Sequence, residues 1–256
     1  MKKYLEEARV IGNEAITEAI YKLTFESPQI ARTALPGQFV NVSVETAFLR
    51  RPFGIVEACG ETGEVTIIYR LVGTGTAAMT NLRAGDTISV EGPLGEGTFS
   101  TAAGKVLLVG GGVGLAPLIC LAGRLAEKPV VLVGGKTKEE TFWREFFKDK
   151  AEKVYVTTDD GSAGIQGFAV AALPQIFSEN KIDRIAVCGP TVMMKTIAEK
   201  AQEAGISCEV SMEKRMACGI GVCLGCTFES KKDKKRYKVC SDGPVFDSKE
   251  VFCDEI

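Results

Sequence analysis

Four cysteines stand close together near the end of the chain, with the spacing Cys218-x4-Cys223-x2-Cys226-x13-Cys240. The whole chain of 256 residues has nine cysteines and no histidine. Without histidine it cannot build a Ser-His-Asp triad or a metal site with imidazole ligands. The cysteine-bearing segment is therefore expected to fold as a loop around a group that is bound by sulfur alone.

The nature of that group follows from the compartment and from the spacing. The first residues, MKKYLEEARV, carry charges where a secretion signal would be apolar, so we expect a cytoplasmic protein whose clustered thiols bind metal. A C-x4-C-x2-C triplet with a distant fourth cysteine is the spacing of a plant-type [2Fe–2S] centre. Gly219, Gly221 and Gly225 would let backbone N–H groups approach the negatively charged sulfurs. A structural zinc site, which usually pairs two short C-x2–4-C knuckles, is the alternative.

The composition is that of an ordinary soluble protein. Hydrophobic residues make up 45% and charged residues 25% of the chain, and the net charge of −2 predicts no binding of nucleic acid or anionic membrane. Val106–Gly123 is uncharged, but it contains five glycines and Pro117. Because such a backbone would be poorly shielded in hydrocarbon, a buried strand, a tight loop and a helix start are expected there instead of a membrane span.

The hydrophobic pattern changes character near residue 101. Before it, short alternating segments separated by turn signals predict an antiparallel barrel or sandwich. The expected strands are Ala8–Ile11, Ile20–Glu26, Phe39–Val44, Ile55–Ala58, Glu64–Leu71 and Thr87–Glu91.

After residue 101, buried strands alternate with helices, which predicts a doubly wound parallel sheet. The expected strands are Lys105–Val109, Val130–Gly134, Lys153–Thr157, Arg184–Cys188 and Cys208–Met212. The expected helices are Leu115–Glu127, Lys138–Lys148, one that begins within Gly167–Leu173, and Thr191–Ala204. We therefore predict three domains: a barrel over 1–100, an α/β domain over 101–212 and a small cluster module over 213–256.

Two motifs in the barrel suggest a site for a flavin nucleotide. Arg51-Pro52 at a strand start could place a guanidinium on a pyrophosphate. Gly73–Thr76 precedes an apparent helix over Ala77–Leu82, whose first N–H groups are suited to phosphate. Each motif is weak by itself, and an arginine before an edge-strand proline is often only structural. Together in one barrel they reinforce each other.

The second domain carries an incomplete dinucleotide fingerprint. The loop after its first strand reads Gly112-x-Gly114-x-x-Pro117 instead of G-x-G-x-x-G, and no acidic residue ends the second strand. Cys188-Gly189-Pro190 stands at the carboxyl end of the fourth strand, at the edge where open α/β sheets bind ligands. Cys188 is either a buried apolar residue or one that faces substrate.

Taken together, these motifs resemble those of the ferredoxin–NADP reductase superfamily over nearly the whole chain. The stretches RMACGIGVCLGC and YKVCSDGPVF resemble the electron-transfer subunit of class 1B dihydroorotate dehydrogenase. The resemblance implies FAD contacts from Arg51, Pro52, Phe53, Gly54, Ile68, Tyr69, Arg70, Gly75 and Thr76. It implies NAD contacts from Gly112, Gly114, Cys188, Gly189 and Pro190. It implies [2Fe–2S] ligation by Cys218, Cys223, Cys226 and Cys240.

The resemblance also implies the function. Electrons from the FMN of a separate dihydroorotate dehydrogenase catalytic subunit would cross the cluster and FAD to NAD⁺, in pyrimidine biosynthesis. The assembly would be a two-plus-two heterotetramer without nucleic acid or membrane. No residue of this chain need act as a catalytic acid or base.

Two features leave alternatives open. Many superfamily members have Ser or Thr where this chain has Gly54, so contact with flavin N5 would fall to a backbone N–H. Lys136 and Lys138 leave room for the extra phosphate of NADP. The competing functions are a flavin and [2Fe–2S] subunit of a ferredoxin–NAD(P) reductase or sulfide dehydrogenase-like complex, and a zinc-stapled interaction module. In the former, an aspartate usually replaces the first cluster cysteine, whereas this chain has Cys218.

Overall fold

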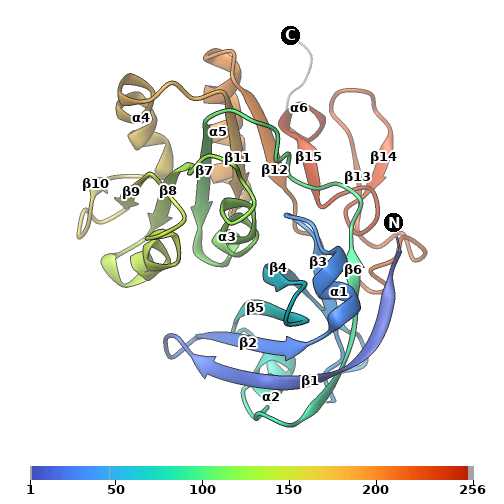
Figure 1. Ribbon diagram of the computed structural model, residues 1–256. Coiled ribbons are helices and arrows are strands. Elements are labelled where there is room, and N and C mark those ends of the chain that lie inside the picture. Colours follow the sequence, from blue (N-terminus) through green and yellow to red (C-terminus); the bar gives the residue numbers. More distant parts are fainter. Residues whose placement is uncertain (1, 46, 253–256) are drawn as a thin grey trace. The chain divides into compact units, whose positions relative to one another are not determined.

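The computed structural model describes residues 2–45 and 47–252, which form two compact units (Figure 1). The first unit comprises the residues up to Thr98 together with Glu213–Phe228 and Tyr237–Pro244. The second comprises Phe99–Met212, Glu229–Arg236 and the residues from Val245 on. The C-terminal segment therefore contributes to both units, and all four clustered cysteines belong to the first.

A closed six-stranded antiparallel barrel forms the first unit, in the order β1-β2-β5-β4-β3-β6. Its strands are β1 (Tyr4–Ala15), β2 (Ile20–Glu26), β3 (Phe39–Val42), β4 (Arg51–Cys59), β5 (Glu64–Arg70) and β6 (Thr87–Leu94). Two short helices, α1 (Pro28–Thr33) and α2 (Thr74–Met79), lie in its connections. Each expected strand overlaps one of the six, and of the two architectures left open the barrel is the one that forms.

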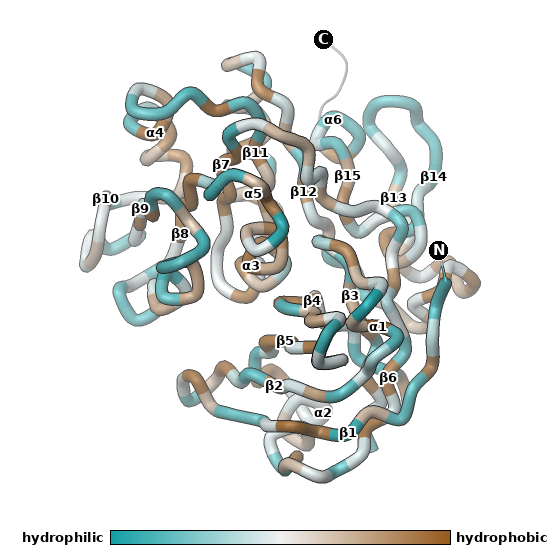
Figure 2. The backbone as a smooth tube through the Cα atoms, in the orientation of Figure 1, coloured by the Kyte–Doolittle hydropathy of each residue, from teal (hydrophilic) through white to brown (hydrophobic). Residues whose placement is uncertain are grey.

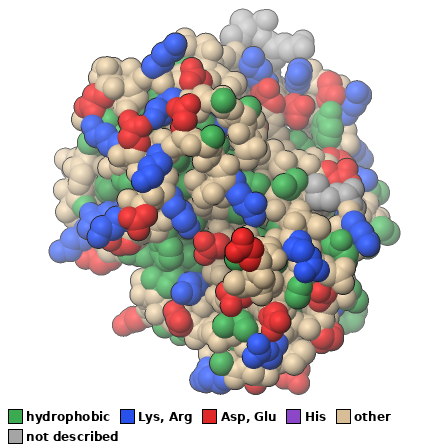
Figure 3. All heavy atoms as spheres, in the orientation of Figure 1, with side chains coloured by type: hydrophobic (Ala, Val, Ile, Leu, Met, Phe, Trp, Pro, Cys, Tyr) green, Lys and Arg blue, Asp and Glu red, His purple; other side chains and the backbone are tan. Residues whose placement is uncertain are grey.

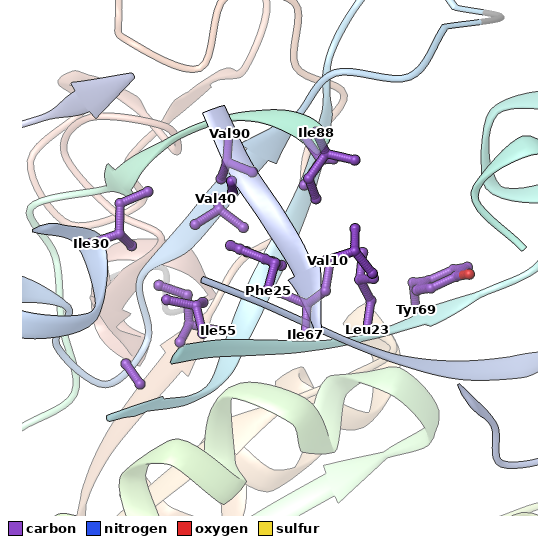
Figure 4. Close-up of a cluster of buried hydrophobic side chains, with 14 of the residues drawn as sticks. Val10, Leu23, Phe25, Ile30, Val40, Ile55, Ile67, Tyr69, Ile88 and Val90 are labelled. Atoms are coloured by element: carbon purple, nitrogen blue, oxygen red, sulfur yellow. The ribbon is translucent and has the colours of Figure 1, made fainter. Parts of the chain in front are cut away.

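Alternation along the strands fills the barrel with apolar side chains. Val10, Leu23, Phe25, Ile67 and Val90 are each fully buried and belong to one cluster (Figure 4). Every second residue of a strand therefore points to the outer face of the barrel. Because the interior is filled, only the outer face of the barrel can bind a ligand.

A seven-stranded sheet forms the second unit, in the order β10-β9-β8-β7-β11-β12-β15. Its strands are β7 (Val106–Gly111), β8 (Val130–Gly135), β9 (Lys153–Thr158), β10 (Ile165–Gln166), β11 (Arg184–Cys188), β12 (Ser207–Ser211) and β15 (Val245–Asp247). All neighbouring pairs are parallel except β12 with β15. The predicted parallel α/β sheet is thus confirmed, with one antiparallel edge strand added from the C-terminal segment.

Helices and 3₁₀ turns connect these strands (Figure 1). They are η1 (Gly112–Gly114), α3 (Leu115–Ala122), η2 (Lys138–Phe147), η3 (Ala169–Ala172), α4 (Leu173–Glu179), α5 (Thr191–Glu203) and α6 (Ser248–Val251). The helix expected over Leu115–Glu127 ends earlier, at Ala122, because Gly123 follows and glycine is a poor helix former. The α-helix expected over Lys138–Lys148 is a run of 3₁₀ turns, in which Trp143 and Phe147 are buried. Burial of these two rings outweighs the local helix propensity.

The surface carries both signs of charge. On the face drawn in Figure 3, Lys and Arg side chains are interspersed with Asp and Glu, as the net charge of −2 leads one to expect. The tip of the hairpin formed by β13 (Thr227–Glu229) and β14 (Arg236–Lys238) is hydrophilic (Figure 2). Among residues 2–45 and 47–252, no helix is long and apolar enough to cross a bilayer.

Candidate functional site: a flavin barrel and an iron–sulfur loop

The two barrel motifs predicted to bind FAD lie against each other. Arg51 begins β4, and its guanidinium donates a hydrogen bond to the carbonyl of Leu49 at 2.7 Å. A Cβ placed on Gly75 would lie 3.2 Å from Nε of Arg51. Helix α2 begins at Thr74 and not at Ala77 as the sequence suggested, so Gly75 belongs to its first turn. The Arg51 side chain thus lies beside the first turn of α2, and a guanidinium and helix N–H groups are both suited to a phosphate oxygen.

Thr76 shapes the turn that precedes α2. Its hydroxyl oxygen accepts the backbone N–H of Val72 at 2.9 Å and that of Gly73 at 3.2 Å. The same hydroxyl lies 3.1 Å from the carbonyl of Gly73, to which it can donate. Because these contacts are local, Thr76 organises the backbone of the predicted phosphate turn.

The predicted triplet Ile68, Tyr69 and Arg70 is divided between the two faces of β5. The ring of Tyr69 is buried with the barrel cluster (Figure 4). It stacks on the ring of Tyr21, with 5.5 Å between the centroids. Its hydroxyl donates to Oδ1 of Asn13 at 3.1 Å, and burial raises the pKa of Tyr69 to about 12. Ile68 and Arg70 therefore face outward, and Tyr69 can reach an outer ligand only through its backbone.

The rest of the Arg-Pro motif follows the same strand. Phe53 is half-buried and its ring packs against Tyr69, with 5.9 Å between centroids. Pro52 and Gly54 are also only partly exposed, and Gly54 pairs with Phe39 of β3. The motif is thus held by the barrel, with Arg51 at the start of β4.

The residues predicted to bind NAD gather at the carboxyl edge of the parallel sheet. A Cβ on Gly114 would lie 2.5 Å from the carbonyl oxygen of Cys188, so the loops after β7 and β11 are in close contact. Gly189 has a φ of +154°, and Pro190 caps the start of α5. The side chain of Cys188 is buried, which favours the structural reading of this residue. Gly112 follows β7 at the same edge, with open space above its Cα.

An acidic residue that sequence analysis did not find stands at this edge. Glu140 accepts the backbone N–H of Lys136 at 2.9 Å, just beyond the end of β8. The dinucleotide fingerprint has an acidic residue directly at the end of the second strand. Here the first turn of η2 brings the carboxylate of Glu140 to that strand end. Lys136 and Lys138 are exposed on the same segment.

The clustered cysteines occur as two pairs in the first unit. Cys218 Sγ accepts the backbone N–H of Cys223 at 3.4 Å, and Cys226 Sγ accepts that of Cys240 at 3.4 Å. Among the described residues, no three Cys, Asp or Glu side chains are arranged to hold a single ion. Four cysteine thiols in two pairs match the four-cysteine ligand set of a [2Fe–2S] centre.

Backbone N–H groups surround the sulfurs. Burial opposes ionisation of Cys218, but the N–H groups of Cys223, Ile220 and Val222 outweigh it and lower its pKa to about 6. Cys226 and Cys240 are the buried pair. Burial and the neighbouring Cys226 thiol raise the pKa of Cys240 to about 12. The amide dipoles aimed at Cys218 stabilise its thiolate, and this is the environment that an anionic cluster requires. The residues present therefore fit an iron–sulfur centre.

Unusual backbone conformations shape the loop. Leu224 adopts a φ of +60°, a conformation that costs a non-glycine residue about 1–2 kcal/mol. It stands where the N–H of Gly225 reaches Cys223 Sγ at 3.5 Å. Gly219 has a φ of +71°, and a Cβ there would lie 2.0 Å from Nδ2 of Asn41 in β3. Such strain is typical of ligand sites.

The loop is anchored to the barrel through its second half. Glu96 donates its N–H to the carbonyl of Ser241 at 2.9 Å, and Gly97 donates to Gly243 at 3.0 Å. Gly95 has a φ of +89°, and a Cβ there would lie 2.5 Å from Pro244. The cysteine loop and the flavin motifs are consequently parts of one compact unit.

Comparison with known domains defines the class of this protein. Residues 7–99 match the oxidoreductase FAD-binding domain, and residues 213–252 match the iron–sulfur cluster binding domain of dihydroorotate dehydrogenase B. The chain is therefore an iron–sulfur flavoprotein of the oxidoreductases. The predicted FAD and cluster cofactors are confirmed at the level of these domains, and the zinc alternative is disfavoured.

Full-length relatives define the family. The chain is 39% identical, over 96% of its length and 97% of the relative, to the dihydroorotate dehydrogenase B (NAD(+)) electron transfer subunit of Caldanaerobacter subterraneus subsp. tengcongensis. It is 38% identical to the subunit of the same name from Fusobacterium nucleatum subsp. nucleatum, covering 96% and 98% of the two chains. The chain belongs to the family of dihydroorotate dehydrogenase B (NAD⁺) electron transfer subunits, as its motifs predicted.

Solved structures agree with the fold. The structure of an NADH-dependent reduced ferredoxin–NADP oxidoreductase superposes with a TM-score of 0.86 at 32% identity, covering 96% of this chain and 89% of that one. The ferredoxin reductase of carbazole 1,9a-dioxygenase gives a TM-score of 0.65 at 21% identity, over 80% and 67% of the chains. The second likeness supports the ferredoxin-reductase fold alone.

Proposed function

We propose that this chain carries electrons from a dihydroorotate-oxidising catalytic subunit, through its iron–sulfur centre and FAD, to NAD⁺. The main support for the proposal is that the paired cysteines and the flavin motifs lie in the same compact unit. FAD supplies the exchange between two-electron transfer to NAD⁺ and one-electron transfer at the cluster. The residues of this chain hold, orient and insulate these groups.

We assign the ligands as follows. Cys218, Cys223, Cys226 and Cys240 hold the cluster, and their surrounding N–H groups stabilise its negative charge. Arg51 and the first turn of α2 hold the phosphates of FAD. The glycine-lined carboxyl edge of the parallel sheet holds NAD. Within this machinery, no proton transfer by a side chain is required.

The outer part of the cysteine loop is suited to contact the catalytic subunit. Cys223 is exposed, and the apolar side chains of Ile220, Val222 and Leu224 beside it are 39%, 74% and 61% exposed. Apolar residues gathered on one short loop are typical of a protein interface. A partner seated there would exclude water from the outer pair of cysteines and bring its own redox group close.

Glu140 supports NAD as the preferred nucleotide. A carboxylate at the end of β8 suits a ribose hydroxyl and would repel the extra phosphate of NADP. Lys136 and Lys138 carry the opposite charge, but both extend from an exposed segment. We therefore assign NAD to this edge.

The assembly and its location complete the proposal. Because its relatives are named as subunits, the chain has a catalytic partner, and we propose a two-plus-two heterotetramer that contains FMN in the partner. We place it in the cytoplasm, where a reducing environment keeps clustered thiols available for iron.

Reconstitution with the catalytic subunit tests this function. The two chains, co-expressed and purified without oxygen, should reduce NAD⁺ when dihydroorotate is added. Omitting this chain should leave dihydroorotate oxidation by artificial dyes but abolish the reduction of NAD⁺. A complex that contains full iron and flavin yet shows no such reduction would refute the proposal.

The reductase likeness supports a second candidate, a subunit that serves a ferredoxin. Its support is the similarity over 96% of this chain to the ferredoxin–NADP oxidoreductase structure. The same purified chain should then transfer electrons from NADH to oxidised ferredoxin, or from reduced ferredoxin to NAD⁺, without dihydroorotate. A ferredoxin rate well above the dihydroorotate rate would favour this candidate.

Replacing Arg51 tests the flavin site. We expect Arg51→Gln to weaken FAD binding by about 10–100-fold, because a hydrogen bond to a charged group contributes roughly 1.5–3 kcal/mol. Fluorescence titration of flavin-free protein with FAD measures the loss. Arg32→Gln, in an exposed position of the same unit, is the control. Equal affinities in both variants would show that Arg51 does not contact the flavin.

A further inference from the structure

Asn41 is a buried polar side chain whose hydrogen-bonding groups the barrel leaves unused. It is 1% exposed, and neither Oδ1 nor Nδ2 has a hydrogen-bond partner among the described residues. An unpaired buried amide costs about 1–3 kcal/mol. A side chain kept at that cost, in a barrel otherwise well packed, indicates that a partner absent from the polypeptide completes it.

The strand pattern directs Asn41 to the outside of the barrel. Val40 and Val42, its neighbours in β3, both point into the apolar core (Figure 4 labels Val40). Alternation therefore places Asn41 on the opposite face. The register pairs it with Pro52 of the flavin motif on β4. Asn41 thus lies beside the strand that carries the predicted FAD contacts.

The cysteine loop covers Asn41 on that outer face. The position that a Cβ of Gly219 would occupy lies only 2.0 Å from Nδ2 of Asn41. Gly219 directly follows Cys218, one of the proposed ligands. The amide group therefore lies next to the strand that carries the Arg-Pro motif and is covered by the start of the cysteine loop.

We infer that Nδ2 of Asn41, which has no partner among the described residues, would donate a hydrogen bond to the bound iron–sulfur centre and so set its reduction potential. The inference rests on the proposed role of Cys218 as a ligand. A donor is the right group here, because an oxygen facing negatively charged sulfur would be repelled. Asn41 is a positioning residue that acts through the cluster and touches no substrate.

The direction of the effect follows from charge. Reduction adds one electron to an already anionic centre, so an N–H donor stabilises the reduced form more than the oxidised form. Removing the donor must favour the oxidised cluster. The potential should fall, while the number of bound irons stays the same.

A redox titration of the complete two-subunit complex tests the inference. In Asn41→Leu the one-electron equilibrium should shift about tenfold toward the oxidised cluster, which is about 59 mV. In Asn41→Asp, which keeps the shape but replaces the donor by an acceptor, the shift should be at least as large. EPR spectra of the reduced cluster should change in both variants. Asn81→Leu, the same replacement at an exposed position of the barrel unit, should titrate as wild type.

The outcomes separate this inference from the proposed function. Wild-type potentials and unchanged EPR spectra in both Asn41 variants, with the cluster intact, would overturn the inference and leave the function standing. Loss of the cluster from both variants with FAD retained would also count against it, because Asn41 would then be scaffolding. A wild-type protein without a cluster would refute the assigned ligands themselves.

Discussion

Replacing Cys223 by serine is expected to stop electron flow from dihydroorotate to NAD⁺ while sparing the flavin. Cys223 is exposed at the tip of the loop, and its sulfur accepts the N–H of Gly225. A serine hydroxyl is a much weaker ligand for iron than a thiolate. Changes one shell further out from a metal already cost about 10–100-fold, so the rate should fall by at least about 100-fold.

The NADH-dependent activity of Cys223→Ser, which depends on FAD and not on the cluster, serves as the internal control. Reduction of a dye by NADH needs only the nucleotide edge and the barrel, so it should continue near the wild-type rate. Cys59→Ser, at the end of β4 in the same unit, makes the same chemical change away from the loop and should leave both activities intact. Full dihydroorotate-dependent activity in Cys223→Ser would mean that electrons bypass the cluster.

Adding one methyl group at Gly219 is expected to prevent cluster assembly. Its φ of +71° is unfavourable for alanine, and the new Cβ would lie 2.0 Å from Nδ2 of Asn41. Backbone strain alone costs about 1–2 kcal/mol. The collision adds to it and must displace either Asn41 or the adjoining Cys218. Iron content of Gly219→Ala, purified without oxygen, should fall to a small fraction of the wild-type value.

Gly85→Ala separates strain from collision. Gly85 has a φ of +97° in the same unit, but a Cβ there would meet nothing within 4 Å. That variant should lose about 1–2 kcal/mol of stability and keep its iron. In Asn41→Ala/Gly219→Ala the obstructing amide is gone, so part of the iron should return. Normal iron in Gly219→Ala alone would show that the loop adapts to the extra methyl group.

Much of this organisation could be predicted because it depends on local patterns. Short apolar segments separated by turn signals were enough to predict all six barrel strands. The strands Ile20–Glu26 and Arg184–Cys188 have the predicted bounds. The cysteine spacing predicted the kind of cluster, because a metal centre requires fixed ligand types at fixed separations, and the resemblance of the stretches RMACGIGVCLGC and YKVCSDGPVF indicated the family. The convergence of Arg51 with Gly75 was only a hypothesis in the sequence, and the barrel closes to bring them together.

Other features depend on contacts that no local pattern records. Strand β15 has only three residues and forms because it pairs with the edge strand β12. Helix α1 is likewise short, with six residues between two barrel strands. Asn41 looks like any polar residue in a strand until the cysteine loop is seen to cover it. Glu140 lies at the end of β8 because the first turn of η2 brings its carboxylate to the N–H of Lys136. In each case the signal lies in tertiary structure.

The most direct test of the account is the iron, sulfide and EPR analysis of the complex purified without oxygen. We predict two irons, two acid-labile sulfides and one FAD for each copy of this chain, and a one-spin EPR signal after reduction. Dihydroorotate alone should produce that signal. Zinc in place of iron and sulfide, or a cluster that dihydroorotate cannot reduce, would contradict the account.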